Sequence, residues 1–574
     1  MKTGKRKPFR AALAAISAML ILPAFAFLPG CGGKNYDSNN FLPNGTEGNP
    51  YQIVRDPVTL KIFVPVTPTN PPFGNLKMFK KLSEMTNLKF EFIEADLGAY
   101  QNMRAAAWDS GDLPDLFLYN NGIEEQVSFQ PFGAHTPFND PNLQVEGVGD
   151  VGSLIDNYMP VYKKLLDENF NITTDEDAKK IATLPDGKMY SALSVNDVPR
   201  DLSFKMFINQ KWIDALQAEG WDIKDADGIK TTDDYLAVLR AFRDGDPNHN
   251  GRTGKDNNDE IGVGAMSVNY LRNFILGAYG YVSAGVEVEN DGSAMTFVPT
   301  TDAYRQYLKF MRSLFGEKLI HSDVYSISTD AQLAQKGMEY RLGSFCSAAA
   351  YLTVGYEYES EYVTFGPLTS EYYAGDPIQW RTSPVFQPTG AVIPSGTKKV
   401  REAARLLDIM YSDVGCQLLA YGEEGVDFVW DDAEKTSWTF QVPPTWTGNQ
   451  EAYRATLTPH PGSGSGLYWK YGFVGKMNDP IITALNRMSE RYQPYLKTPV
   501  PPAMKMTSAE YDEVILLRTD IEQQVKYWET EFAKGSQDAA DDKDWSDFTA
   551  LMKQYRCERF AEIYNGAYAR YKNA

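Results

Sequence analysis

An alternation of strand-type and helix-type segments near the N-terminus constrains the fold of this chain more than any other feature. Residues 58–66 (VTLKIFVPV) have the continuous apolar character of a buried strand, and residues 88–95 (LKFEFIEA) alternate apolar and polar side chains as a second strand does. A helical pattern over residues 73–87 separates them, and after a further helix a third strand is expected at residues 115–120 (DLFLYN). Strands that alternate with helices form a mainly parallel sheet, so we expect an α/β domain.

The third of these strands ends at Tyr119 and Asn120. Ligands of open α/β sheets bind beyond the carboxyl ends of the strands. Tyr119 and Asn120 are therefore candidates for a ligand-binding site.

The first 30 residues have the layout of an export signal. Five basic residues lie within the first ten positions, an uncharged apolar stretch follows, and Leu28-Pro29-Gly30-Cys31 resembles the lipobox of bacterial lipoproteins. The apolar stretch spans eighteen residues, which is marginal for a permanent membrane span. We therefore expect cleavage before Cys31 and lipidation of Cys31, although residues 24–26 (AFA) offer a competing site for ordinary signal peptidase.

The chain is long and acidic. Its 574 residues are enough for at least two domains or one large two-lobed body. The formal net charge is −19, and removal of the five basic residues of the signal gives −24, which disfavours nucleic acid as a ligand because phosphate binding requires a basic face. Apart from Cys31 the cysteines are Cys346, Cys416 and Cys557, too few and too scattered for a disulfide framework or a zinc site, and we expect them to be buried.

Seven motifs follow one another along the rest of the chain. They are SGDLPDLF (110–117), LPDGKMYSA (184–192), FINQKWIDALQAEG (207–220), TTDDYLAVLRAFRDGDPNHNG (231–251), VREAARLLDIMYSDVG (400–415), YGEEGVDF (421–428) and DWSDFTALMKQYRCERFAEIYNGAYARY (544–571). In this order they resemble landmarks of the bacterial extracellular solute-binding proteins of family 1, in particular the lipoproteins related to alginate- and oligosaccharide-binding proteins of ABC importers.

The resemblance implies an α/β, two-lobed periplasmic-binding-protein-like fold with a hinge that the chain crosses three times and a helical C-terminus. Apolar stripes agree with closing helices at residues 508–534 and 545–571. The expected order is a signal peptide at 1–30, a tether at 31–57, lobe 1 from 58–192 and 388–465, and lobe 2 from 193–387 and 466–574.

The resemblance also implies the function. Such a protein is not an enzyme; it closes two lobes over a ligand, here expected to be an oligosaccharide, and delivers it to the transmembrane subunits of an ABC permease. Together with the lipobox this predicts a monomeric receptor, lipid-anchored at the extracytoplasmic face of the bacterial cell membrane. The length, linkage and acidity of the glycan stay open, as does a peptide ligand.

Residues 246–260 (DPNHNGRTGKDNNDE) begin like the calcium loop of an EF-hand. Acidic and amide ligands occupy positions 1, 3 and 5, and Gly251 turns the chain at position 6, but position 12 is Asn257 instead of Glu. By itself the stretch is equally typical of a solvated Asx/Gly turn. The branch of proteins that the chain resembles carries DPNxNGxxDE, here with an insertion, which implies a structural calcium ion. Its implied ligands are Asp246, Asn248, Asn250, the backbone carbonyl of Arg252, Asp259 and Glu260.

A polysaccharide-degrading enzyme is the alternative function. Glycoside hydrolases and lyases use paired carboxylates, and 75 acidic residues supply many potential pairs. The four histidines are widely separated, and neither an HExxH, a GxSxG nor a Walker motif occurs. A surface adhesin is a third possibility, but it gives no reason for a hinged pattern.

Sugar binding requires flat aromatic faces and planar polar groups. Trp380 lies between Gln379 and Arg381, just before a segment expected to cross the hinge, and Arg381 would pair with two hydroxyls or with a carboxylate. Each aromatic residue also has an alternative role in core packing. The further candidates for ligand contact are Tyr119, Asn120, Tyr351, Trp438 and Trp469.

Overall fold

The computed structural model describes residues 39–573 except 67–70, 97–98, 120–125, 128–129, 131–132, 171–175, 256–258, 327–329, 374–378, 448–449, 460–466 and 502–503. The expected signal peptide, Cys31 and Asn120 lie outside the described residues. Across the described ranges, no helix is both long and apolar enough to cross a bilayer.

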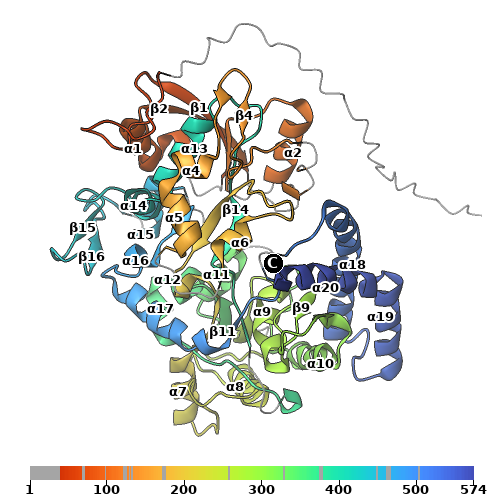
Figure 1. Cartoon of the computed structure of the whole chain (residues 1–574). Coiled ribbons are helices and arrows are strands. Elements are labelled where there is room, and N and C mark those ends of the chain that lie inside the picture. Colours follow the sequence, from red (N-terminus) through yellow and green to blue (C-terminus); the bar gives the residue numbers. More distant parts are fainter. Residues whose placement is uncertain are drawn as a thin grey trace, which may run out of the picture.

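A twisted sheet forms the core of the first lobe, at the top of Figure 1. Its order within the described residues is β17-β6-β14-β3-β1-β2. The strands are β1 (Val58–Val66), β2 (Leu88–Asp96), β3 (Leu116–Leu118), β6 (Ala192–Asn196), β14 (Phe386–Val392) and β17 (Tyr468–Trp469). β1 runs parallel to both β2 and β3, whereas β14 is antiparallel to β3 and β6. The strand–helix–strand alternation read from the sequence is thus confirmed.

The helices of this lobe follow from their local sequence. α1 (Lys77–Thr86) buries Met78, Phe79 and Leu82, and burial of each such side chain contributes roughly 1.5–3 kcal/mol. Asn87 ends α1 in the left-handed conformation, which an amide side chain tolerates. α2 (Tyr100–Ser110), α4 (Leu154–Tyr158), α5 (Pro160–Glu168), α6 (Ala178–Ala182), α13 (Val400–Tyr411) and α14 (Asp413–Ala420) complete this lobe.

The second lobe, below, is built on a smaller sheet. Its strands, in the order β12-β7-β11-β8, are β12 (Tyr362–Thr364), β7 (Lys205–Asn209), β11 (Leu342–Ser347) and β8 (Ile261–Gly264). Around it lie α7 (Gln210–Ala218), α8 (Thr232–Asp244), α9 (Val268–Ile275), α10 (Asp302–Gly316), α11 (Asp330–Met338) and α12 (Ala350–Tyr358). α8 begins with a reciprocal capping box between Thr231 and Asp234, which satisfies two free backbone N–H groups.

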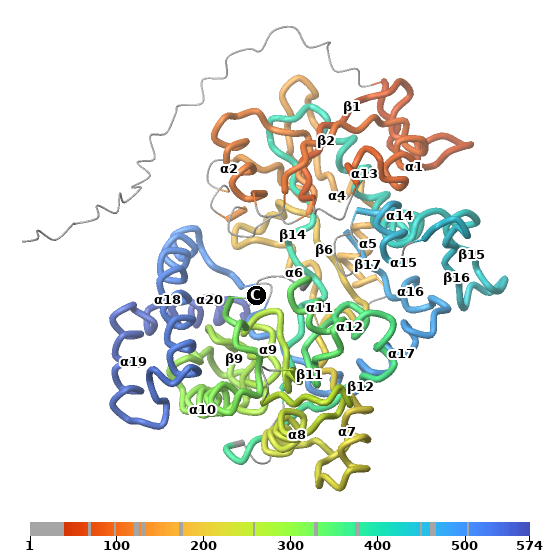
Figure 2. The backbone as a smooth tube through the Cα atoms, turned by 180° about the vertical axis from the view of Figure 1, so that it is seen from behind, coloured from red at the N-terminus to blue at the C-terminus, as the bar shows by residue number. Residues whose placement is uncertain are grey.

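The C-terminal helices pack beside α9 and α10 of the second lobe (Figures 1 and 2). The helix expected at 508–534 is α18 (Ser508–Lys534). The helix expected at 545–571 is two helices, α19 (Asp542–Gln554) and α20 (Cys557–Asn573), so this prediction was wrong. Arg556 separates them with a φ of 62°, a left-handed conformation that the apolar periodicity did not reveal.

The chain passes between the two sheets three times, as expected. It leaves the first lobe between β6 and β7, returns between β13 (Trp380–Arg381) and β14, and leaves again after β17. β13 pairs in parallel with β18 (Leu496–Lys497), so two of the crossings lie side by side. Tyr468 and Trp469 pair with β6 of the first lobe, although they begin a segment expected in lobe 2. The residue boundaries of the lobes stay a prediction.

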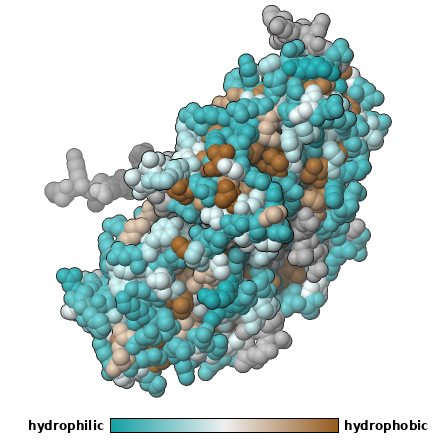
Figure 3. Space-filling model, turned by 90° about the vertical axis from the view of Figure 1, so that its left-hand side faces the viewer, coloured by the Kyte–Doolittle hydropathy of each residue, from teal (hydrophilic) through white to brown (hydrophobic). Residues whose placement is uncertain are grey.

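A further cluster of buried apolar side chains connects the elements on the left of Figure 1 to the second lobe. It joins residues of the second lobe to the hairpin of β15 (Phe428–Trp430) and β16 (Trp438–Phe440) and to α15 (Gln450–Leu457), α16 (Tyr471–Val474) and α17 (Pro480–Glu490). The surface on this side is mainly hydrophilic, with hydrophobic side chains gathered in separate patches (Figure 3). The cluster connects the lobes next to the hinge.

Candidate ligand-binding cleft

Two adjoining pockets lie at the junction of the lobes. The first has a volume of about 360 Å³ and the second of about 280 Å³. Phe204 and Cys346 line both, so the two pockets are neighbours that share part of a wall. Small-molecule sites in proteins are typically concave spaces of roughly 300–1,000 Å³ lined by aromatic side chains and a few polar groups.

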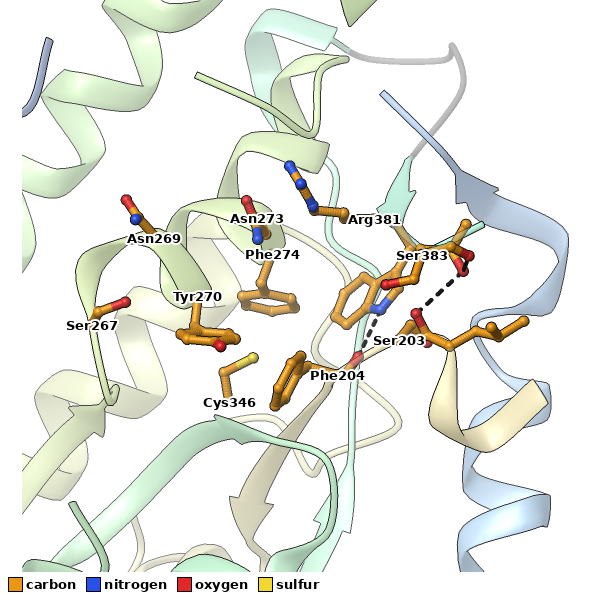
Figure 4. A pocket seen from close by; sticks show the side chains of 13 residues that line it. Ser203, Phe204, Ser267, Asn269, Tyr270, Asn273, Phe274, Cys346, Arg381 and Ser383 are labelled. Atoms are coloured by element: carbon orange, nitrogen blue, oxygen red, sulfur yellow. Dashed lines mark hydrogen bonds between the residues drawn. The ribbon is translucent and has the colours of Figure 1, made fainter. Parts of the chain in front are cut away.

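The first pocket takes three of its polar side chains from α9. The apolar face of α9 buries Val268, Leu271, Phe274 and Ile275 in the core of the second lobe. Asn269, Tyr270 and Asn273 of α9 line the pocket, and the Tyr270 ring lies beside Phe204, 4.6 Å away between ring centroids (Figure 4). Amides and a tyrosine ring on one rigid helix supply hydrogen bonds and a flat apolar face, the combination that a sugar ring requires.

Trp380 lines the first pocket but is held firmly in place. Its side chain is only 3% exposed, and its indole Nε1 donates to the Phe204 carbonyl oxygen at 2.9 Å. The ring stacks on Tyr492 with a centroid distance of 4.0 Å and meets Phe274 edge-on at 4.9 Å. The structure therefore places Trp380 as a fixed wall of the pocket, and Trp380 stays a candidate for ligand contact.

Arg381 and Gln379 flank Trp380 in the sequence, but only Arg381 lines a pocket. Arg381 lines the first pocket and donates through Nη1 to the Val282 carbonyl oxygen at 3.3 Å, and burial lowers its pKa. Gln379 is buried, donates to the Asn290 side-chain oxygen and lines neither pocket. Of these two, only Arg381 is placed to meet a ligand.

The second pocket combines aromatic rings with paired charges. Tyr351 on α12 stacks on Tyr356 at 4.9 Å with an interplanar angle of 5°. Trp469 lies on another wall, where its indole Nε1 donates to Asp201 Oδ2 at 2.8 Å. Glu451 and Arg454, both from α15, also line this pocket. The structure thus brings Tyr351 and Trp469 to one pocket, and both stay candidates for ligand contact.

Two other aromatic candidates lie away from both pockets. Trp438 is fully buried, packs on Phe473 at 4.6 Å and donates through Nε1 to the Phe473 carbonyl oxygen, so we correct its assignment from a ligand contact to a core residue. Tyr119, at the end of β3, is 4% exposed and has a φ of 62°. Burial raises the pKa of its hydroxyl, and it lines neither pocket. Apolar composition alone did not distinguish core rings from pocket rings.

Several polar groups of the cleft were missed by sequence reasoning. On α9, Asn269 and Asn273 stand four positions apart on one face of the helix, and that spacing was a usable signal. Glu451 and Arg454 carried no comparable signal, because an i, i+3 pair of opposite charges is typical of any solvated helix face.

In the calcium-loop candidate, Asp246 and Asn250 cap successive turns of the described residues. Asp246 accepts the backbone N–H of Asn250 at Oδ1 (3.0 Å) and that of Gly251 at Oδ2 (2.8 Å). Asn250 Oδ1 accepts the backbone N–H of Arg252 at 2.9 Å, and the Asn250 amide donates to the Asp259 carboxylate. None of these residues lines either pocket.

Glu260 is the exception within this loop. It is 1% exposed, and its carboxylate lies near the Asn248 side chain without a well-formed hydrogen bond to either oxygen among the described residues. Burial, and then the charges of Asp259 and Asp246, raise the pKa of Glu260 to about 7. Across the described ranges, no three His, Cys, Asp or Glu side chains are arranged to hold a metal ion. A buried carboxylate without a well-formed hydrogen bond, beside two further carboxylates, is nevertheless the chemistry that a hard cation accepts.

No protein-family profile matches the chain. Among curated proteins, it is 25% identical over 578 aligned residues to the fructooligosaccharide ABC transporter substrate-binding protein FusA of Streptococcus pneumoniae serotype 4, covering 97% of this chain and 98% of that protein. The alignment thus spans both lobes.

Solved structures share the fold. A structure of an EF-hand mutant of S. pneumoniae FusA in complex with fructo-nystose has a TM-score of 0.70 at 21% identity, over 90% of this chain and 99% of the other. The alginate-binding protein AlgQ2 without calcium ion has a TM-score of 0.68 at 18% identity, over 91% of this chain and 100% of the other.

These relatives are binding proteins, and they favour the solute-binding interpretation over the polysaccharide-degrading one. The resemblance read from the seven motifs and the two-lobed fold are both confirmed. The chain is therefore a two-lobed homologue of the substrate-binding proteins of ABC transporters.

Proposed function

We propose that the chain is the extracytoplasmic substrate-binding protein of an ABC importer and that it captures an oligosaccharide in the cleft between its lobes for delivery to the permease. The observation that carries the proposal is the lining of the cleft. Tyr270 and Asn273 in the first pocket, and Tyr351 and Trp469 in the second, place aromatic rings and planar polar groups around two adjoining pockets at the lobe junction. The relative FusA, named for fructooligosaccharide, supports a saccharide over a peptide.

The proposal includes a membrane anchor and a monomeric state. Lipidation of Cys31 would hold the protein beside its permease, and the lipobox at residues 28–31 supports it. Replacement of Cys31 by Ser should release the protein into the medium. Retention of that variant in the membrane would instead indicate an uncleaved helix.

The proposal also includes a structural calcium ion at residues 246–260. The carboxylate oxygens of buried Glu260, next to Asp246 and Asp259, fit a hard cation. Asn248, Asn250 and the backbone carbonyl of Arg252 would add neutral oxygens. Relatives described as an EF-hand mutant and as calcium-free support an ion in this group of proteins. When bound, the ion would hold residues 246–252 and 259–260 together and supply no chemistry.

Thermal-shift and calorimetric titration of the purified protein tests the ligand class. The panel holds fructooligosaccharides such as kestose, other neutral oligosaccharides, oligouronates and a peptide mixture. One saccharide class should raise the melting temperature, because a ligand at a hundredfold excess over its Kd stabilises the folded state by about 2.7 kcal/mol. Shortening of a glycan during the assay, or a response to peptides alone, would contradict the proposal.

A further inference from the structure

Arg454 is a buried guanidinium with part of its hydrogen-bonding capacity unused. Its side chain is 1% exposed. Nε donates to Glu451 Oε2 at 3.0 Å, and Nη1 donates to the Ala420 carbonyl oxygen at 3.2 Å and to Thr458 Oγ1 at 3.4 Å. Nη2 has no partner among the described residues. Since a buried donor without an acceptor destabilises the folded state, an acceptor is expected at Nη2.

Two aromatic rings fix the direction of this free donor. The Arg454 guanidinium carbon lies 5.4 Å from the ring centroid of Tyr421 and 5.4 Å from that of Trp469. Trp469 is itself held by its hydrogen bond to Asp201. A planar guanidinium packed against two rings loses little further freedom when it binds an acceptor, so Nη2 is preorganised.

The unused donor belongs to the second pocket. Arg454 and Glu451 line that pocket together with Tyr421, Trp469 and Tyr351. Burial, and then the charge of Glu451, raise the pKa of Tyr351. Tyr351 lies on α12 and is therefore close enough to Glu451 and Arg454 of α15 to interact with them electrostatically. A ligand in this pocket would therefore lie next to an ion pair that carries both a donor group and a carboxylate.

The charges that line this pocket are paired. Arg454 is balanced by Glu451, and Arg200 lies 3.6 Å from Asp201 and donates to Asn486 Oδ1 at 3.0 Å. An acidic sugar would meet two carboxylates and no unpaired cation here. Two neighbouring hydroxyls suit the pair, because one hydroxyl can accept from Nη2 while the other donates to the carboxylate.

We infer that Glu451 and Arg454 together recognise a pair of adjacent hydroxyls on an uncharged saccharide, and that they make the second pocket selective against acidic sugars. The inference rests on the proposed function, because it assumes a saccharide in the cleft. It names the ligand class that the sequence left open.

The test compares Glu451→Gln with the unmodified protein by calorimetric titration. The probes are kestose, the neutral trisaccharides of galactose and mannose, and their uronic-acid counterparts. The unmodified protein should bind a neutral probe and not its uronic counterpart. Glu451→Gln should weaken binding of that neutral probe at least tenfold and shift the preference toward the uronic acid, because Arg454 then carries an unbalanced positive charge.

Glu424→Gln is the matched control, because Glu424 forms an exposed ion pair with Lys435 at 3.0 Å outside the pocket. Glu451→Asp keeps the charge but shortens the reach, so it should weaken binding without changing the preference; it also serves if Glu451→Gln melts early. Unchanged affinity in folded Glu451→Gln, or a preference of the unmodified protein for uronic acids, overturns the inference alone. Failure of every saccharide to bind overturns the proposed function and the inference with it.

Discussion

The two pockets of the cleft differ in the parts of the chain that build them. The first is lined by the hinge and the second lobe, with α9 on one side and residues 380–383 on the other. The second takes Tyr351 from α12 of the second lobe, but takes Trp469 from β17, a strand of the first lobe's sheet. The first pocket thus depends on the second lobe and the hinge, whereas the second pocket spans both lobes.

Because of this difference, we expect the two pockets to contribute unequally to ligand affinity and to closure of the two lobes. A pocket without walls from the first lobe's sheet depends less on the angle between the lobes, whereas a pocket with walls from both lobes is complete in only one arrangement. We therefore expect the first pocket to contribute binding energy in open and closed states, and the second to favour the closed state, which is how a ligand shifts such an equilibrium.

Trp469→Ala should have the largest effect. It removes the ring beside Arg454 and the hydrogen bond to Asp201. We expect a loss of about 3 kcal/mol in binding free energy by calorimetry, and no compaction on ligand addition by small-angle scattering. Trp221→Ala is the control, because Trp221 is 36% exposed and lines neither pocket. Full compaction of the Trp469 variant would show that the second pocket does not drive closure.

Removal of calcium should affect stability and neither pocket. Saturation at a hundredfold excess over Kd contributes about 2.7 kcal/mol, so chelation should lower the melting temperature while saccharide affinity stays constant. Asp246→Ala should abolish the response to added calcium. The substitution removes one of the proposed ligands, whose two carboxylate oxygens also accept the backbone N–H groups of Asn250 and Gly251.

Asp291→Ala is the control for the calcium experiment, because Asp291 caps an exposed turn through the Ser293 backbone N–H at 2.8 Å. An unchanged melting temperature after chelation, together with no metal by elemental analysis, would assign residues 246–260 to a solvated turn. A change in saccharide affinity on chelation would mean that the loop communicates with the cleft.

Asn273→Ala should weaken binding without preventing closure. Asn273 is one of the amides that α9 presents to the first pocket, and loss of one hydrogen bond costs about 1 kcal/mol, or roughly fivefold in Kd. Calorimetry measures the affinity and scattering the compaction, with Gln335→Ala, an exposed amide on α11, as the control. Loss of compaction in the Asn273 variant would contradict the prediction that only the second pocket drives closure.

Lys205 should have the smallest effect, which is a change in the stability of the folded protein with pH. Its ammonium is buried near the junction of the pockets and donates to the carbonyl oxygens of Arg200 (2.5 Å), Ser203 (3.3 Å) and Ala348 (3.1 Å), and burial lowers its pKa to about 8 from 10.5. Between these values the unfolded chain binds more protons, so the Lys205 contribution to stability should rise with pH from about 8 to 10.5.

Urea unfolding at two pH values within and below this window measures the effect. The stability of the unmodified protein relative to Lys205→Met should increase by about 1 kcal/mol at the higher pH. Lys526→Met, which alters an exposed lysine of α18, should show no such change. An equal pH response in both variants would mean that Lys205 does not carry the buried charge.

The aromatic candidates show why the sequence predicted the site only in part. Trp380 and Trp438 have similar polar and apolar neighbours along the chain, yet Trp380 lines a pocket and Trp438 is enclosed by Phe473 and Tyr421. Which ring faces open space depends on elements far away in sequence. The helix break at Arg556 was missed for a related reason, because the apolar stripe continues across it.

The sequence by itself determined the α/β alternation, the three crossings of the hinge and the relationship to binding proteins, because these follow from local periodicity and from motifs in a fixed order. Only the tertiary structure decided which side chains share the cleft. Glu451 and Trp469 come from late segments, whereas Asp201 and Tyr351 come from earlier ones, and the crossings bring all four together. Physical contact between such distant residues depends on how the sheets pack, and side-chain patterns within each segment cannot predict that packing.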